Sequence, residues 1–149
     1  MKNDSALFFT CSLIEYIGRQ QKLNRRDVVL ALGKDALKRI YKYSDVLHCE
    51  PIAKVADEYI HMAQIQAGNY DNVSACRYDV PDYWTIGEVY ERLIEDVTDS
   101  DLAVSFDIIE TLMEVYNSWV SDSISNYNSD FYYQSRDYIY ECYKAGQLL

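Results

Sequence analysis

Apolar residues recur every three or four positions over most of the chain, which is the spacing of one face of an α-helix. The first apolar stripe lies in residues 5–21 and consists of Leu7, Cys11, Ile14 and Ile17. A second stripe follows Asn24, a suitable helix cap, and meets Gly33, which interrupts or ends the helix. Two further stripes occupy residues 34–47 and 51–68. The pattern predicts a helical N-terminal half.

The C-terminal half continues in helices after one interruption. Residues 68–84 break the periodicity and predict an irregular loop, with room for a short strand or hairpin. Helices are then expected over 85–97, where Thr85 and Glu88 have the spacing of a capping box, over 102–124, and after Ser135. The expected fold is all-α: a single-domain helical bundle, residues 1–149, of five to seven helices with one irregular loop around residues 68–84.

Charge is distributed unevenly along this pattern. The net charge is -10, but residues 1–45 hold nine Lys/Arg against five Asp/Glu, a net of +4, whereas residues 46–149 hold five against nineteen, a net of -14. Residues 82–130 contain twelve Asp/Glu and one base. An acidic majority repels phosphate backbones, so we expect no nucleic-acid partner, and a basic protein partner is easier to accommodate.

The cysteines and the apolar runs bear on location. Cys11, Cys49, Cys76 and Cys142 are widely spaced, without a CxxC pair, as in proteins that keep their thiols reduced. No run approaches the length of a transmembrane helix, and no signal peptide is recognisable. These features predict a cytoplasmic chain with no membrane partner.

Two sequence neighbourhoods invite a catalytic interpretation. Glu58 and His61 have the Glu-x-x-His spacing of metal ligands on one helix face, but a di-iron bundle needs a second such pair, which is missing. His48 adjoins Cys49, although neighbouring residues on a helix point in different directions. We therefore expect no catalytic residue, no cofactor and no metal site. A small enzyme with a pocket near these four residues and Asp57 is the alternative.

Basic residues gather in the N-terminal part of the chain and suggest a second alternative. They are Arg19, Lys22, Arg25, Arg26, Lys34, Lys38, Arg39 and Lys42. Two short helices around Gly33 could form a helix-turn-helix. Five acidic residues lie among these bases, however, so we expect a solvated face or a patch that pairs with acidic surface of the same fold.

The most unusual stretch is NYNSDFYYQSRDYIYECY, residues 126–143, with six tyrosines. Its rings encircle the expected last helix, with Tyr138 and Cys142 facing inward, which indicates contacts on more than one side. Tyrosine favours sites where one end of the side chain is dry and the other wet. Together with an acidic helix face, the stretch predicts a partner-binding surface formed by Tyr132, Tyr133, Tyr140, Glu88, Glu91, Glu95 and Trp84.

Four stretches of the chain carry a resemblance to a known family: SLIEYIGRQQKLNRRDVVLALG, DVLHCEPIAKVADEYI, VPDYWTIGEVYERLIEDV and NYNSDFYYQSRDYIYECYKAGQLL. They resemble a family of small, acidic, uncharacterised Firmicutes proteins whose genes lie beside one for an ADP-ribosyltransferase-like protein. The resemblance covers most of the chain and implies a toxin–antitoxin-like context, without supplying a functional residue. The leading hypothesis is therefore a non-enzymatic, antitoxin-like or regulatory protein-interaction module. A homodimer through the tyrosine-rich segment is compatible with it.

Overall fold

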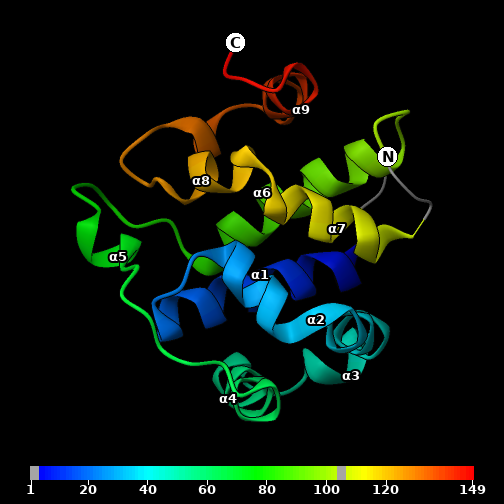
Figure 1. Cartoon of the computed structure of the whole chain (residues 1–149), viewed down its shortest axis with the longest axis vertical. Coiled ribbons are helices and arrows are strands. Elements are labelled where there is room, and N and C mark those ends of the chain that lie inside the picture. Colours follow the sequence, from blue (N-terminus) through cyan, green and yellow to red (C-terminus); the bar gives the residue numbers. More distant parts are fainter. Residues whose placement is uncertain (1–3, 104–106) are drawn as a thin grey trace.

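The computed structural model describes residues 4–103 and 107–149, and every regular element in these two ranges is helical (Figure 1). The elements are α1 (Ser5–Gln21), α2 (Arg25–Lys42), α3 (Ser44–Leu47), α4 (Ile52–Ala63), α5 (Asn72–Ala75), α6 (Tyr83–Thr98), α7 (Ile108–Asn117), α8 (Trp119–Ser125), the 3₁₀ turn η1 (Phe131–Tyr133) and α9 (Arg136–Ala145). The all-α class is confirmed. The expected five to seven helices are too few, because the described residues form nine α-helices.

The largest difference concerns the helix expected over residues 102–124. Its described part begins only at Ile108, capped by Asp107, and it divides at Ser118. Ser118 has extended backbone angles, and its side chain accepts a hydrogen bond from the amide of Val120, so it starts α8. Residues 104–106, which also belong to the expected helix, lie outside the described residues.

Three smaller features of the helices follow from local backbone and capping chemistry. Gly33 adopts φ +79°, a conformation open to glycine, and kinks α2 as its position suggested. Helix α6 begins at Tyr83 because Asp82, not Thr85, is the cap: its carboxylate accepts from the Thr85 amide at 2.7 Å. The loop over residues 68–84 contains the short helix α5 in place of a strand.

The core lies between α1 and α6, which cross the middle of the molecule in Figure 1, with α4 below them and α9 above. Helix α1 buries ten of its residues, and α6 packs along it while also contacting α7 and α9. Apolar side chains of all these helices join one continuous cluster. Because α6 has neighbours on several sides, it buries more than one narrow stripe of its surface.

The closest approach of α1 and α6 occurs at Gly87. A Cβ atom there would lie 2.1 Å from the Ser12 hydroxyl oxygen and 2.9 Å from the Ser12 amide nitrogen and Cα. Gly87→Ala is therefore expected to destabilise the fold by about 1–3 kcal/mol in urea unfolding, despite the better helix propensity of alanine. Because backbone atoms contribute to the clash, Ser12→Gly should not restore stability. An alanine variant as stable as the parent would contradict this packing.

Candidate protein-binding surfaces

The tyrosine-rich segment closes over α6 and leaves a hollow of about 190 Å³, which we name the tyrosine cleft. Its floor is apolar and includes the buried side chains of Leu93 and Ile139. Its rim carries Tyr132 and Tyr133 from η1 and Glu88 from α6. An apolar floor inside a polar, aromatic rim is the arrangement in which protein interfaces place an anchoring side chain.

The two rim tyrosines stand almost at right angles. Their ring centroids are 6.2 Å apart with an interplanar angle of 82°, and Tyr132 makes a similar edge contact with the buried Tyr127. Tyr133 exposes 82% of its surface, more than any other large apolar or aromatic side chain of the described residues. The inner ring is thus held by the fold, while the outer ring is available to another molecule.

Charged groups complete the rim in compensated pairs. Arg92 lies 3.3 Å from Glu88 one turn earlier on α6, with both side chains about half exposed. Arg136 of α9 donates to Asp96 and Glu95 at 3.0 and 3.1 Å. Exposed pairs of the first kind contribute little to stability and can exchange partners at low cost. The cleft therefore offers charges of both signs to a partner.

Three of the seven residues predicted to bind a partner meet in the cleft: Tyr132, Tyr133 and Glu88. Trp84 lies in the first turn of α6 and is not among the cleft residues. It is 37% exposed, and its ring packs against those of Phe8 and Tyr83. Tyr140 is half-buried on α9 and is not among the cleft residues. Of the two side chains expected to face inward, Cys142 is fully buried and Tyr138 is only half-buried.

The expected exposure of Glu91 and Glu95 is wrong. Both are buried, because the side of α6 that carries them lies under the chain start and α9. Glu95 accepts hydrogen bonds from the Asp4 amide at 2.8 Å and from Arg136. The carboxyl of Glu91 is hydrogen-bonded to Glu95, and its Oε2 has no further partner among the described residues. Burial, this hydrogen bond and the charge of Glu95 raise the pKa of Glu91 to about 8.

A second buried polar cluster was not predicted: the sequence pattern placed Arg25 among bases expected to be solvated or to pair with acidic surface, and did not indicate that it is buried. Arg25 is fully buried and makes two hydrogen bonds to Glu15 of α1, at 2.9 and 3.0 Å. It also donates to Asn72 at 3.0 Å and to Tyr127 at 3.2 Å. These contacts join α1, α2, α5 and the segment after α8. The cluster stabilises the fold and has no exposed face.

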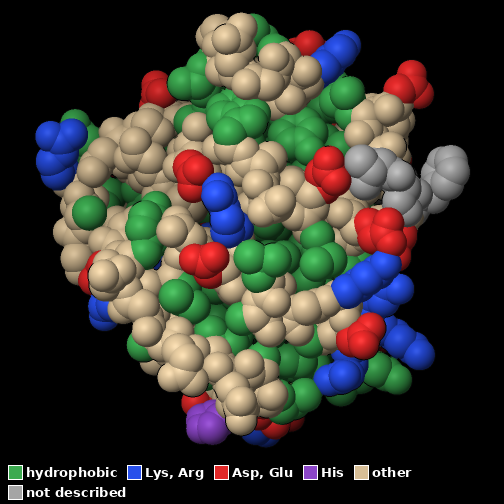
Figure 2. All heavy atoms as spheres, in the orientation of Figure 1, with side chains coloured by type: hydrophobic (Ala, Val, Ile, Leu, Met, Phe, Trp, Pro, Cys, Tyr) green, Lys and Arg blue, Asp and Glu red, His purple; other side chains and the backbone are tan. Residues whose placement is uncertain are grey.

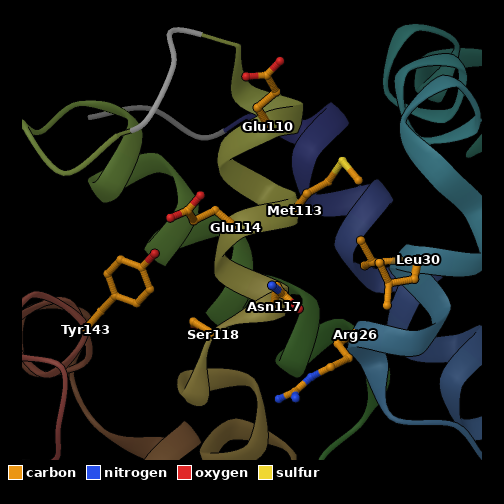
Figure 3. A pocket seen from close by; sticks show the side chains of 9 residues that line it. Arg26, Leu30, Glu110, Met113, Glu114, Asn117, Ser118 and Tyr143 are labelled. Carbon is orange, nitrogen blue, oxygen red and sulfur yellow. The ribbon is translucent and has the colours of Figure 1, made fainter.

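A larger hollow, of about 540 Å³, lies between α2, α7 and α9, and we name it the α7 groove (Figure 3). Figure 3 shows Glu110 and Glu114 along the first part of α7, Tyr143 on the α9 side and Leu30 with Arg26 on the α2 side. In Figure 2 hydrophobic side chains reach the surface on this face, with acidic and basic side chains interspersed. The groove thus brings the acidic face of α7 beside the tyrosine-rich helix.

The residues of the enzyme alternative have local contacts. His48 and Cys49 are exposed after α3, and their side chains contact the carbonyls of Ser44 and Asp45 one turn earlier. His61 is exposed on α4 and its ring contacts Asp57 of the same helix. Glu58 is likewise exposed. In the part of the chain that the structure describes, no group of three or more His, Cys, Asp or Glu side chains could hold a metal ion.

Much of the basic N-terminal charge is paired with the acidic half of the chain. Lys34 binds Glu110, Lys38 lies 3.5 Å from Asp107, and Arg26 lies 3.0 Å from Asp122. This is the intramolecular pairing that the sequence allowed, and it leaves less free positive charge for a nucleic acid. Within the described residues, no helix combines the length and apolar character needed to cross a membrane.

The described residues form an all-α protein with several surface hollows, among them the tyrosine cleft and the α7 groove. In comparisons with known proteins, no family model, curated protein or solved structure matches this chain.

Proposed function

We propose that this chain is a non-enzymatic, cytoplasmic protein-interaction module, an antitoxin-like or regulatory partner of another protein, and that the tyrosine cleft is its principal contact. The observation that carries the proposal is the convergence of Tyr132, Tyr133 and Glu88 on one hollow with an apolar floor. A side chain of the partner would enter the cleft, pack on Leu93 and Ile139, and exchange polar contacts with the rim. The four free cysteines support the cytoplasmic part of the proposal.

Tyr133→Ser is expected to weaken partner binding by about 2 kcal/mol, or roughly thirtyfold in Kd, without lowering the stability of the chain. The reason is that the ring is 82% exposed and supports little of the fold. Tyr43→Ser is the matched control, since Tyr43 is also exposed, at 47%, but follows α2 at a distance from the cleft in sequence and fold.

The partner implied by the family resemblance is the product of a neighbouring ADP-ribosyltransferase-like gene. The tagged chain should be co-expressed with that product and recovered at low and at moderate salt. A complex that the parent and Tyr43→Ser retain, and that Tyr133→Ser loses, is the expected result. Failure to recover any complex at either salt concentration would exclude the antitoxin version of the proposal.

A further inference from the structure

We propose that the α7 groove is a second interaction surface, which binds a basic amphipathic helix of a partner protein. It is separate from the tyrosine cleft, and the two surfaces share none of their lining residues. Three features of the groove favour such an occupant: its size, its apolar lining and the negative charge that the fold leaves uncompensated there.

The groove has the apolar contacts that a helix stripe requires. Leu30 of α2 is 63% exposed, and Met113 of α7 and Tyr143 of α9 are half-buried around the same hollow. A single exposed leucine needs no explanation. Apolar side chains from three helices that face one hollow of about 540 Å³ are different, because they can pack together against one inserted ridge.

The charges select a basic occupant. At the α2 wall, Lys34 is paired with Glu110 and Arg26 with Asp122. Glu114, one turn beyond Glu110 on α7, is exposed and has no salt-bridge partner within residues 4–103 and 107–149. A lysine or arginine of the occupant would therefore meet an unpaired carboxylate, and the net charge of -10 would attract it over a longer range.

The probe is a fluorescein-labelled, 18-residue amphipathic peptide with a leucine stripe and lysines elsewhere, titrated with the full chain and followed by fluorescence anisotropy. Its counterpart carries glutamates in place of the lysines. The lysine peptide should bind the parent, and Leu30→Glu and Glu114→Lys should each weaken binding by about tenfold. Glu114→Lys should at the same time improve binding of the glutamate peptide.

Matched controls lie on α4, where Met62 is 60% exposed and Glu58 is exposed. Met62→Glu and Glu58→Lys change the net charge equally and should leave both titrations unaltered, as should Tyr133→Ser. Absence of binding at low salt would overturn the proposal. Equal weakening by the groove and control variants would also overturn it, because it would show general attraction to an acidic protein. Either result leaves the test of the tyrosine cleft independent.

Discussion

Replacing Arg25 by methionine is expected to lower the free energy of unfolding by about 3–5 kcal/mol at pH 7. The substitution leaves the buried carboxylate of Glu15 with the neighbouring Arg19 as its cationic partner. It also removes the donor that Asn72 and Tyr127 share. A domain of this size is stabilised by roughly 5–15 kcal/mol, so a loss of this magnitude would remove a large fraction of its free energy of unfolding.

Arg26→Met is the matched control for this prediction. Arg26 is the next residue on α2 and pairs with Asp122 at 3.0 Å, but its side chain is 34% exposed and that of Asp122 is 64% exposed. An exposed pair contributes about 0–1 kcal/mol. Urea unfolding of the two variants should therefore separate them clearly. Equal losses for Arg25→Met and Arg26→Met would show that the buried pair does not have the assigned role.

The buried pair of Arg25 and Glu15 should also make the fold sensitive to acid. Burial alone would raise the pKa of Glu15, but the charge and hydrogen bonds of Arg25, with Arg19 and Tyr127, outweigh it and lower that pKa. A carboxyl group with a lowered pKa in the folded state stabilises the fold above its ordinary pKa. That contribution is lost as the pH falls through the lowered value. The free energy of unfolding of Arg25→Met should therefore decrease less on acidification than that of the parent.

Glu91→Gln is expected to stabilise the chain increasingly as the pH rises. In the folded state the pKa of Glu91 is about 8, against an ordinary value of 4.5, so the folded chain retains a proton that the unfolded chain releases. Stability is thus lost as the pH rises from about 4.5 through about 8. Glutamine is a neutral isostere that can still donate to Glu95. The gain in free energy of unfolding over the parent should reach about 1–3 kcal/mol and then level off above about pH 8.

Glu88→Gln is the control, since Glu88 lies one turn earlier on α6 and its half-exposed carboxylate pairs with Arg92. The charge of Glu88 is the smallest of the causes that raise the pKa of Glu91, so Glu88→Gln should change the pH dependence of the parent much less than Glu91→Gln does. The other charged groups that act on the pKa of Glu91 are Glu88, which raises it, and Arg92, which lowers it. The Asp4 amide and Arg136 of α9 donate hydrogen bonds to Glu95. Thermal unfolding between pH 5 and pH 9 makes the comparison. If the stability of Glu91→Gln varied with pH in parallel with that of the parent, this would contradict a proton retained by Glu91 in the folded state.

The helices were predictable where the signal is local. Gly33 and Ser135 mark a kink and a cap through their own backbone and hydroxyl chemistry, and both act as expected. Ser118 was missed because a serine inside an amphipathic stripe is compatible with a continuous helix, and tertiary contacts decide whether it caps a new one. The apolar periodicity continues across the break, so it could not reveal α8 as a separate element.

The sites were predictable only in part, because burial of charge depends on distant partners. Periodicity places Glu95 outside, yet its partners Asp4 and Arg136 are 91 and 41 residues away. Arg25 likewise depends on Tyr127, 102 residues further along the chain. Tyr133 is exposed, as a contact residue must be, and its contact with a partner stays a prediction. The helical spacing of Glu88 also placed it correctly at the surface.

The most direct test of the interaction proposal is photo-cross-linking within cells. A photoreactive phenylalanine analogue is placed at Tyr133 in one variant and at Tyr43 in another, and the adducts are separated by mass. We expect one discrete protein adduct from position 133, reduced when the cleft residue Glu88 is replaced by lysine, and none of that mass from position 43. The same adducts from both positions, or no discrete adduct from position 133, would contradict it.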